Sequence, residues 1–356
     1  MISSPKILIL KMSALGDVVH ALPVLETLRA NHPGAFIAWM IEERFKCLIE
    51  NHPALDEAIP VNTKRWRREI NLNSLKEAFK AFRKIRKEKF DIVLDLHGLI
   101  KSGIISYASG SPKRIGFSAK DCKETVSAIF NNQRAAINDP DCHVVSANLK
   151  ALQTAVPCKD IRYDFSLPAD IEAEEKAERF IQSLALPTGK SIVALNPGAG
   201  FESKRWPLEK FSILADALTS QFDVAVLLTW GPGEEKMVQQ IADSMKGNYL
   251  LAPQTTIVES ISLYRRIALF IGSDSGPLHL SAALGIPCIA LFGPTNPARN
   301  GPYGEHAQAI YKKLSCSFCW KRSCPLGTKE CMNSIEVDGI LSRARDILMT
   351  SKKPDQ

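Results

Sequence analysis

The amino-acid sequence predicts an α/β fold in which two parallel-sheet domains follow one another along the chain. Short apolar runs without polar alternation, such as residues 6–10, are typical of strands buried on both faces of a parallel sheet. Helical patterns separate these runs, and the alternation restarts in the second half of the chain. The 356 residues are also long enough for two domains.

The first domain, residues 1–165, is predicted to begin with the strand 6–10, a loop at 12–16 and one helix over 17–31. Its other strands are expected at 35–41, 57–61 and 91–96, with helices at 45–51 and 76–89. A Pro-bounded stretch at 157–187 separates it from the second domain.

The second domain is predicted at 185–335, followed by a C-terminal helix and tail at 336–356. Its expected strands are 191–195, 224–228, 249–252, 269–272 and 288–292, and its expected helices are 208–219, 234–245, 257–267 and 277–284. Open parallel sheets bind ligands at the carboxyl ends of their strands, so the functional loops should follow strands and line a cleft between the domains.

The composition excludes several classes of protein. With 45% hydrophobic and 23% charged residues, the chain is neither disordered nor a small disulfide-stapled scaffold. No apolar run approaches the roughly 18–20 residues of a membrane-spanning helix, and the run at 7–10 is cut by Lys11. The sequence therefore predicts a folded, cytoplasmic protein.

The net charge of +7 is concentrated in one segment. Residues 64–89 contain eleven Lys and Arg against three Glu, so the rest of the chain sums to −1. For residues 76–89, an exposed and solvated helix face is the favoured interpretation. The run Lys64-Arg65-Trp66-Arg67-Arg68 instead places four cations around an indole, which is typical of a clamp for phosphate or carboxylate groups. An anionic partner is therefore expected at this segment.

The loop 11–17 follows the first strand and opens the first helix. It matches neither the dinucleotide fingerprint G-x-G-x-x-G nor the P-loop, and neither motif occurs elsewhere, which argues against a dehydrogenase and a P-loop kinase. Asp17 has two interpretations. It is either a helix N-cap beside Gly16 or a carboxylate that accepts a proton from a bound hydroxyl.

Three loops of the second domain suggest a phosphate site. Residues 196–200 (NPGAG) and the following 204–207 (KRWP) combine small residues with a Lys and an Arg, which suits a diphosphate. The turn 231–235 places Glu234 near a helix start, where it could simply compensate the helix dipole. In 272–279 (GSDSGPLH), a strand runs into a helix start where the N–H groups of Ser275 and Gly276 could seat a phosphate.

Four of the nine cysteines form a C-x2-C-x4-C-x6-C cluster. In a reducing compartment, Cys316, Cys319, Cys324 and Cys331 suggest a structural zinc or iron site more than a disulfide pair. Lys321 and Arg322 fit an anion-facing loop equally well, so both interpretations stay open.

Together these segments resemble the lipopolysaccharide core heptosyltransferases of glycosyltransferase family 9. The likeness covers nearly the whole chain and rests on seven motifs in order: KILILKMSALGDVVHALP, WMIEERF, KRWRR, FDIVLDLHGLIKSG, LNPGAGFESKRWP, WGPGEE and GSDSGPLHLSAALGIPCIALFGPTNP. The resemblance implies a GT-B fold, with two Rossmann-like domains that face each other across a cleft. The basic KRWRR is most like the type I members, which move L-glycero-D-manno-heptose from ADP-heptose to the inner Kdo of Kdo2-lipid A.

The resemblance also implies a role for each matching position. Asp17 would be the catalytic base, and Lys204 would face the donor diphosphate. The ADP-heptose donor would contact Ala199, Gly200, Lys204, Glu234, Thr255, Asp274, Ser275, Gly276 and His279. The acidic acceptor would contact Lys11, Lys64, Arg65, Arg67, Arg68 and Lys101. Ala199 and Gly200 replace paired threonines of some type I members, so only backbone contacts carry over there.

The implied reaction is an inverting transfer that needs no cofactor, carried out at the anionic inner face of the inner membrane without nucleic acid. The Cys-rich segment departs from the type I pattern and is more familiar from type II-like relatives. A type II or other member that adds heptose to a heptosylated core is therefore an alternative. More distant alternatives are a GT-B-like nucleotide-sugar epimerase and a nucleic-acid binder, although the latter would lack interleaved aromatic residues beyond Trp66.

Overall fold

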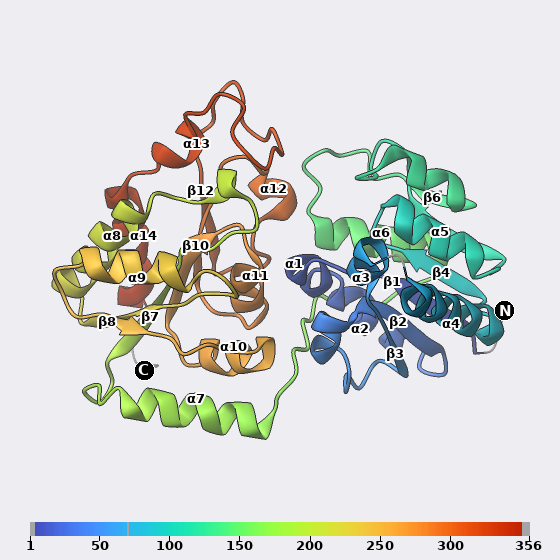
Figure 1. The fold of residues 1–356 in the computed structure, drawn as a ribbon, viewed down its shortest axis with the longest axis horizontal. Coiled ribbons are helices and arrows are strands. Elements are labelled where there is room, and N and C mark those ends of the chain that lie inside the picture. The colour runs from blue at the N-terminus through green and yellow to red at the C-terminus, as the bar shows by residue number, and fades with distance from the viewer. Residues whose placement is uncertain (1–3, 70, 351–356) are drawn as a thin grey trace. The chain divides into compact units, whose positions relative to one another are not determined.

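The structure is a computed structural model that describes residues 4–69 and 71–350. The chain divides into two compact units, residues 1–168 (the N-unit) and 169–356 (the C-unit), which are coloured blue to green and green to red in Figure 1. Each unit contains one six-stranded sheet in which all paired strands are parallel. The predicted α/β fold class with two parallel sheets is confirmed.

The N-unit sheet has the strand order β3-β2-β1-β4-β5-β6. Its strands are β1 (Lys6–Leu10), β2 (Phe36–Glu42), β3 (Glu57–Val61), β4 (Ile92–Asp95), β5 (Lys113–Phe117) and β6 (Gln133–Ala135). Its helices are α1 (Leu15–Val19), α2 (Leu22–Asn31), α3 (Thr63–Arg68), α4 (Leu72–Glu88), α5 (Ile100–Ala108) and α6 (Val144–Ala155), with 3₁₀ turns η1 (Glu43–Leu48) and η2 (Thr125–Phe130).

The C-unit sheet has the order β12-β11-β10-β7-β8-β9. Its strands are β7 (Ser191–Asn196), β8 (Val224–Leu228), β9 (Leu250–Leu251), β10 (Leu269–Ser273), β11 (Cys288–Leu291) and β12 (Ala307–Ile310). Its helices are α7 (Ile171–Ser183), α8 (Leu208–Gln221), α9 (Glu235–Ser244), α10 (Ile257–Tyr264), α11 (Gly276–Ala283), α12 (Pro297–Asn300), α13 (Glu330–Asn333) and α14 (Val337–Thr350), with the 3₁₀ turn η3 (Glu202–Lys204).

Both sheets reverse their strand order at one point, between β1 and β4 in the N-unit and between β7 and β10 in the C-unit. The apolar runs of the sequence are explained by burial of the central strands, since every residue of Ile7–Leu10 and of β8 is buried. Ligands of such sheets bind beside the carboxyl ends of the strands at the reversal. The loops after β1, β4, β7 and β10 are therefore where each unit should hold its site.

Several predicted elements differ from the structure. The helix expected over 17–31 is two helices, because Pro23 lies in the first turn of α2, where its missing N–H costs nothing, and a continuous helix would need that N–H. The strands β5 and β6 were not predicted, since Lys113, Arg114 and Arg134 make their sequences polar. The basic run at 64–68 lies in α3, and α7 occupies much of the stretch at 157–187. No helix in the described residues is long and apolar enough to cross a membrane.

Candidate active site

Asp17 lies on α1, just after β1, and its carboxylate is surrounded by cations. Lys123 Nζ lies 3.0 Å from Oδ2 and 3.3 Å from Oδ1, and Lys11 Nζ lies 3.7 Å from Oδ1. Oδ2 also accepts the N–H of Ala14 at 3.2 Å. Asp17 is therefore not the N-cap residue, which is Ala14, although its side chain does bond to the cap backbone. The N-cap interpretation of Asp17 is thus wrong, and its role as a proton acceptor stays a prediction.

The charges around Asp17 decide its protonation. Burial by itself would raise the pKa of Asp17, but Lys123 and Lys11 outweigh burial and hold the pKa well below its usual value. The nearby His97 is buried, and its desolvation together with the charge of Lys11 lowers its pKa well below the usual value. At neutral pH this site therefore holds an ionised carboxylate beside a neutral imidazole.

The turn after β4 belongs to the FDIVLDLHGLIKSG motif, but the sequence analysis did not predict His97 as a site residue. Asp95 shapes this turn, because its Oδ1 accepts the N–H groups of His97 at 3.1 Å and Gly98 at 3.3 Å. His97 is 4% exposed, and neither ring nitrogen has a hydrogen-bond partner among the described residues. Its position after a strand at the sheet reversal could have identified it. Lys123, in the loop between β5 and η2, carries no comparable signal.

The predicted acceptor residues divide into two groups. Lys11, 2% exposed, donates to the carbonyl of Leu96 at 2.6 Å. Lys101, at the start of α5, donates to Thr63 Oγ1 at 3.3 Å and lies 3.8 Å from Glu42 Oε1. The charges of Lys11 and Lys101 both act on His97, so the structure brings these two lysines to the Asp17 cluster.

The basic clamp of α3 is arranged differently. Arg65 forms an ion pair with Glu77 of α4, so its side chain is held by that helix, while Lys64 and Arg68 are exposed. Thr63, the first residue of α3, accepts from Lys101 and donates to Glu42, which ties the start of the clamp to the Asp17 side of the sheet. The side chain of Arg67 lies outside the described residues.

In the C-unit, the centre of the predicted donor site is Asp274, directly after β10. Its Oδ2 accepts from Lys204 Nζ at 2.7 Å and from Thr295 Oγ1 at 2.7 Å, and its Oδ1 lies 3.2 Å from His279 Nε2. Burial would raise the pKa of Asp274, but His279 and Lys204 lower it below its usual range. Thr295, which lies in the FGPTNP motif, is a site residue that the sequence analysis missed.

The other predicted donor residues follow neighbouring strands of the same sheet. Ala199 and Gly200 lie after β7, which pairs with β10 through Asn196 and Gly272. Glu234 lies after β8 and its carboxylate accepts the N–H of Gly231 at 2.8 Å. A Cβ at Gly198 would overlap the Glu234 carboxylate, so a larger residue at this position would have to displace the Glu234 side chain.

The remaining donor candidates lie at helix starts. Ser275 is the N-cap of α11, which begins at Gly276, and Pro277 occupies its first turn as expected. Thr255 precedes α10 and its hydroxyl lies 2.7 Å from that of Ser260. The nine predicted donor residues thus lie on the segments that follow β9, β8, β7 and β10, including η3 and the first turn of α11.

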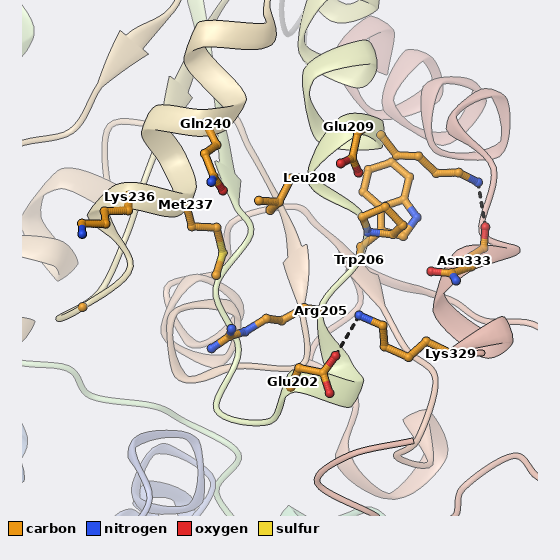
Figure 2. Close-up of a pocket in the computed structure, with 13 residues that line it drawn as sticks. Glu202, Arg205, Trp206, Leu208, Glu209, Lys236, Met237, Gln240, Lys329 and Asn333 are labelled. Atoms are coloured by element: carbon orange, nitrogen blue, oxygen red, sulfur yellow. Dashed lines mark hydrogen bonds and ion pairs between the residues drawn. The ribbon is translucent and has the colours of Figure 1, made fainter. Parts of the chain in front are cut away.

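A separate pocket of about 830 Å³ lies beside these segments. Lys236, Met237 and Gln240 of α9 form one side, and Trp206 and Glu209 lie on the other (Figure 2). None of the nine predicted donor residues lines it, so it is distinct from the Asp274 site.

The Cys-rich loop, residues 316–331, contacts two segments of the predicted donor site. The N–H of Ser203 donates to the carbonyl of Arg322 at 3.1 Å, and its hydroxyl donates to the carbonyl of Lys321 at 2.6 Å. The N–H of Trp320 donates to Pro294 at 2.9 Å. The loop therefore supports both the turn that carries Lys204 and the segment that carries Thr295.

The four thiols of this loop act on one another electrostatically. Burial raises the pKa of Cys331, and Cys316, Cys319 and Cys324 raise it further, whereas backbone N–H groups, Lys329 first, lower the pKa of Cys324. Within residues 4–69 and 71–350, however, no group of three or more His, Cys, Asp or Glu side chains is placed so that it could hold a metal ion. The predicted zinc or iron site therefore has no support in the structure.

Comparison with known proteins identifies the class. The two parallel-sheet units form a GT-B fold, and a solved Escherichia coli heptosyltransferase WaaC with ADP has the same fold, with a TM-score of 0.74, 23% identity and coverage of 96% of this chain and 99% of that one. The sequence model of glycosyltransferase family 9 (heptosyltransferase) matches residues 78–330. The chain belongs to this family and is a glycosyltransferase.

Curated relatives of both subtypes are similar to the chain. Lipopolysaccharide heptosyltransferase 1 of Campylobacter coli is 29% identical over 306 residues, which cover 83% of this chain and 86% of that protein. Lipooligosaccharide heptosyltransferase 2 of Campylobacter jejuni is 27% identical over 355 residues, which cover 95% and 96%. The recognition of the family from the sequence is thus confirmed, while the subtype is left open by these likenesses.

Proposed function

We propose that this enzyme transfers L-glycero-D-manno-heptose from ADP-heptose to the inner Kdo of Kdo2-lipid A, with inversion, during synthesis of the lipopolysaccharide core. The single observation that carries the proposal is the ionised Asp17, which lies among lysines at the sheet reversal of the N-unit. A carboxylate that stays ionised can take a proton, and the surrounding lysines suit an acidic acceptor. The names of the similar heptosyltransferases support heptose as the transferred sugar.

In this proposal the C-unit binds the donor. Lys204 contacts the diphosphate from its position at the Asp274 carboxylate, and His279 stays beside the other carboxylate oxygen. Ser275 and Gly276 offer the N-terminal end of α11 to a phosphate. Ala199, Gly200, Glu234 and Thr255 complete the pocket from the neighbouring strand ends. The solved structure with ADP supports a nucleotide donor in this fold.

The N-unit binds the acceptor. Lys11 and Lys101 lie nearest the base and meet the Kdo carboxylates, whereas Lys64, Arg65, Arg67 and Arg68 of α3 contact the lipid A phosphates. The enzyme works as a peripheral protein on the cytoplasmic face of the inner membrane, where this acceptor is embedded.

The proposed step moves one proton and one sugar. Asp17 removes the proton of the acceptor hydroxyl, the hydroxyl oxygen bonds to the anomeric carbon from the face opposite ADP, and the bond from that carbon to the phosphate oxygen breaks. Negative charge develops on the leaving diphosphate, and Lys204 stabilises it. The transition state is oxocarbenium-like and no covalent intermediate is required, so one base and one cation suffice.

The test is mass spectrometry of Kdo2-lipid A after incubation with ADP-heptose and purified enzyme. One added heptose is expected, and Asp17→Asn should lower turnover by about 10²- to 10⁴-fold while ADP still binds. The Asn variant keeps the size and the contact to Ala14, so a fold defect does not explain its loss. Unchanged turnover in this variant would return Asp17 to a purely structural role.

A second acceptor is the specific alternative. The likeness to a heptosyltransferase 2 over 95% of the chain favours testing it. No product from Kdo2-lipid A, together with transfer to an acceptor that already carries one heptose, would move the enzyme to the second step and leave the roles of Asp17 and Lys204 unchanged.

A further inference from the structure

We propose that helix α4, with the neighbouring α5 and η2, is a membrane-binding face that inserts apolar side chains into an anionic lipid surface. The proposal deepens the proposed function, on which it rests for the reason why the enzyme approaches a membrane. It differs from the sequence-based interpretation of α4 as a merely solvated basic helix.

Three large apolar side chains of α4 face solvent. Leu72 is 75% exposed, Leu75 57% and Phe79 68%. With about 100° of rotation per residue, these three positions fall within about 60° of one another on the helix surface. The helix is held to the sheet by a different face, since Ser74 and Ile85 are its buried residues. The exposed apolar side chains therefore do not contribute to the packing of α4 on the sheet.

A band of cations begins beside the apolar stripe and continues toward the C-terminal end of α4. Lys76, Lys80, Arg83 and Lys87 are all exposed and lie on the adjoining side of the stripe by the same rotation. The two carboxylates of the helix lie on the far side of these cations and are occupied, because Glu77 pairs with Arg65 and Glu88 lies 3.3 Å from Lys6. An apolar stripe beside a band of Lys and Arg is the pattern of a helix that lies in a membrane interface.

The neighbouring elements extend this face. On α5, Ile100, Ile104 and Tyr107 are exposed at helical spacing, and on η2, Val126 and Ile129 are exposed. These elements touch: the guanidinium of Arg86 on α4 donates to the carbonyl of Ala108 on α5 at 3.2 Å, and the rings of Tyr107 and Phe130 are 6.5 Å apart. Eight exposed large apolar residues thus gather on three adjoining elements.

The same elements reach the Asp17 cluster. Lys101, which follows the exposed Ile100, donates to Thr63, and Lys123, just before η2, contacts Asp17. A lipid surface bound by α4, α5 and η2 would therefore adjoin the place where the acceptor hydroxyl is activated.

Charge selects the lipid surface over a second copy of the chain. An isologous contact through α4 would bring the same band of Lys and Arg from two copies together, with no exposed carboxylate on the stripe to pair with them. Anionic headgroups neutralise those cations, and the acyl boundary takes up Leu72, Leu75 and Phe79.

The test is co-sedimentation of the full chain with vesicles of phosphatidylethanolamine and phosphatidylglycerol, and with vesicles of phosphatidylcholine alone. The variants are an apolar triple (Leu72→Ser, Leu75→Ser, Phe79→Ser), a charge triple (Lys76→Gln, Lys80→Gln, Lys87→Gln) and a control triple (Ile171→Ser, Ile213→Ser, Met349→Ser). The control removes three equally exposed apolar side chains from the C-unit. Thermal unfolding verifies that each variant folds. If the apolar triple does not fold, the single variant Phe79→Ser replaces it in the test.

The wild type should bind the anionic vesicles at least about tenfold more tightly than the neutral ones, and each α4 triple should lower that binding about tenfold while the control does not. High salt should weaken binding without abolishing it, because the apolar stripe remains. Binding by the apolar triple equal to that of the wild type would overturn the proposal. So would dimers of the wild type that become monomers in the apolar triple, because the face would then be a self-interface.

Activity separates this proposal from the proposed function. On a water-soluble acceptor without acyl chains, the apolar triple should turn over like the wild type, whereas on acceptor in vesicles it should be slower by about the loss in binding. If the heptosyl transfer itself is misassigned, no variant makes product but the vesicle results still decide the membrane face.

Discussion

At the scale of single residues, the pairing of Asp17 with Lys123 sets how strongly the carboxylate holds a proton. Lys123 contributes the largest of the charges that lower the pKa of Asp17, against burial, which raises it. The backbone beside Lys123 is fixed, since the N–H of Glu124 donates to the carbonyl of Gly98 at 3.1 Å, while the Lys123 side chain is 45% exposed. Lys123 is therefore the more solvent-exposed member of the pair, and in the proposed function it is the one that an acidic acceptor would meet.

Lys123→Met should shift the pH dependence of catalysis. A base must be ionised, so activity is lost as pH falls through the pKa of Asp17, which in the wild type lies well below the usual value. Without Lys123, burial raises that pKa, and the acidic limb of kcat/KM should move toward neutral pH. The measurement is a pH–rate profile, with Lys120→Met of the same loop as the matched control, since Lys120 instead contacts Asn138. Identical profiles for both variants would argue that Lys123 does not act on the base.

Lys204→Ala should weaken ADP binding and turnover together. A charge-assisted hydrogen bond to a phosphate contributes about 1.5–3 kcal/mol, which corresponds to roughly 10- to 100-fold in affinity. Calorimetric titration with ADP measures this loss. Lys236→Ala is the control, because Lys236 lines the pocket of Figure 2 and not the Asp274 site. Weaker binding in Lys236→Ala and none lost in Lys204→Ala would move the nucleotide to that pocket.

At the scale of elements, α7 is held to α10 by ion pairs within the C-unit. Arg265 and Arg266 each donate to Glu174 at 2.6 Å. Burial opposes ionisation of Glu174, but Arg266, then Ser262 and Arg265, lower its pKa from 4.5 to about 2. A carboxylate with a lowered pKa in the folded state stabilises the fold above pH 4.5, and this contribution is lost as pH falls toward 2.

Glu174→Gln should therefore destabilise the protein at neutral pH and converge with the wild type in acid. The loss at pH 7 should be about 1 kcal/mol, because the pair is partly exposed and screened. Denaturant unfolding at pH 7, 4 and 2.5 measures the difference. Glu178→Gln should cost less, since the Glu178 side chain is 52% exposed and its only cationic partner among the described residues is Arg266 at 3.2 Å, beside a hydrogen bond from Gln182 at 3.0 Å. A constant difference between Glu174→Gln and the wild type at all three pH values would contradict the ionic explanation.

At the scale of the whole molecule, the sequence predicts the alternating strands and helices. It does not predict contacts that form only when distant segments pack together. The buried runs identified the central strands, and the rule that ligands bind at strand ends led directly to Asp17 and Asp274. Strands β5 and β6 were missed because Lys113, Arg114 and Arg134 interrupt their apolar pattern. Of the two, β6 lies at the edge of the sheet, where charged residues are tolerated.

The sequence also could not predict side chains that distant loops bring to the two predicted sites. Lys123 and Thr295 reach Asp17 and Asp274 only through the fold, over separations of 106 and 21 residues. The outward orientation of Leu72, Leu75 and Phe79 was hidden as well, because the helical pattern gives a face but not which side meets the sheet. Spacing alone likewise suggested a metal at four cysteines whose side chains are not placed around one in the described residues.

The Cys-rich loop links the reactivity of its thiols to the segments of the predicted donor site. Lys321 and Arg322 hold the turn that carries Lys204, and Trp320 holds the segment that carries Thr295. Oxidation or alkylation of the cysteines in this loop should therefore disturb the two segments that carry Lys204 and Thr295. We therefore expect enzyme stored without a reductant to show a changed KM for the proposed donor, which steady-state kinetics with and without a reductant would measure.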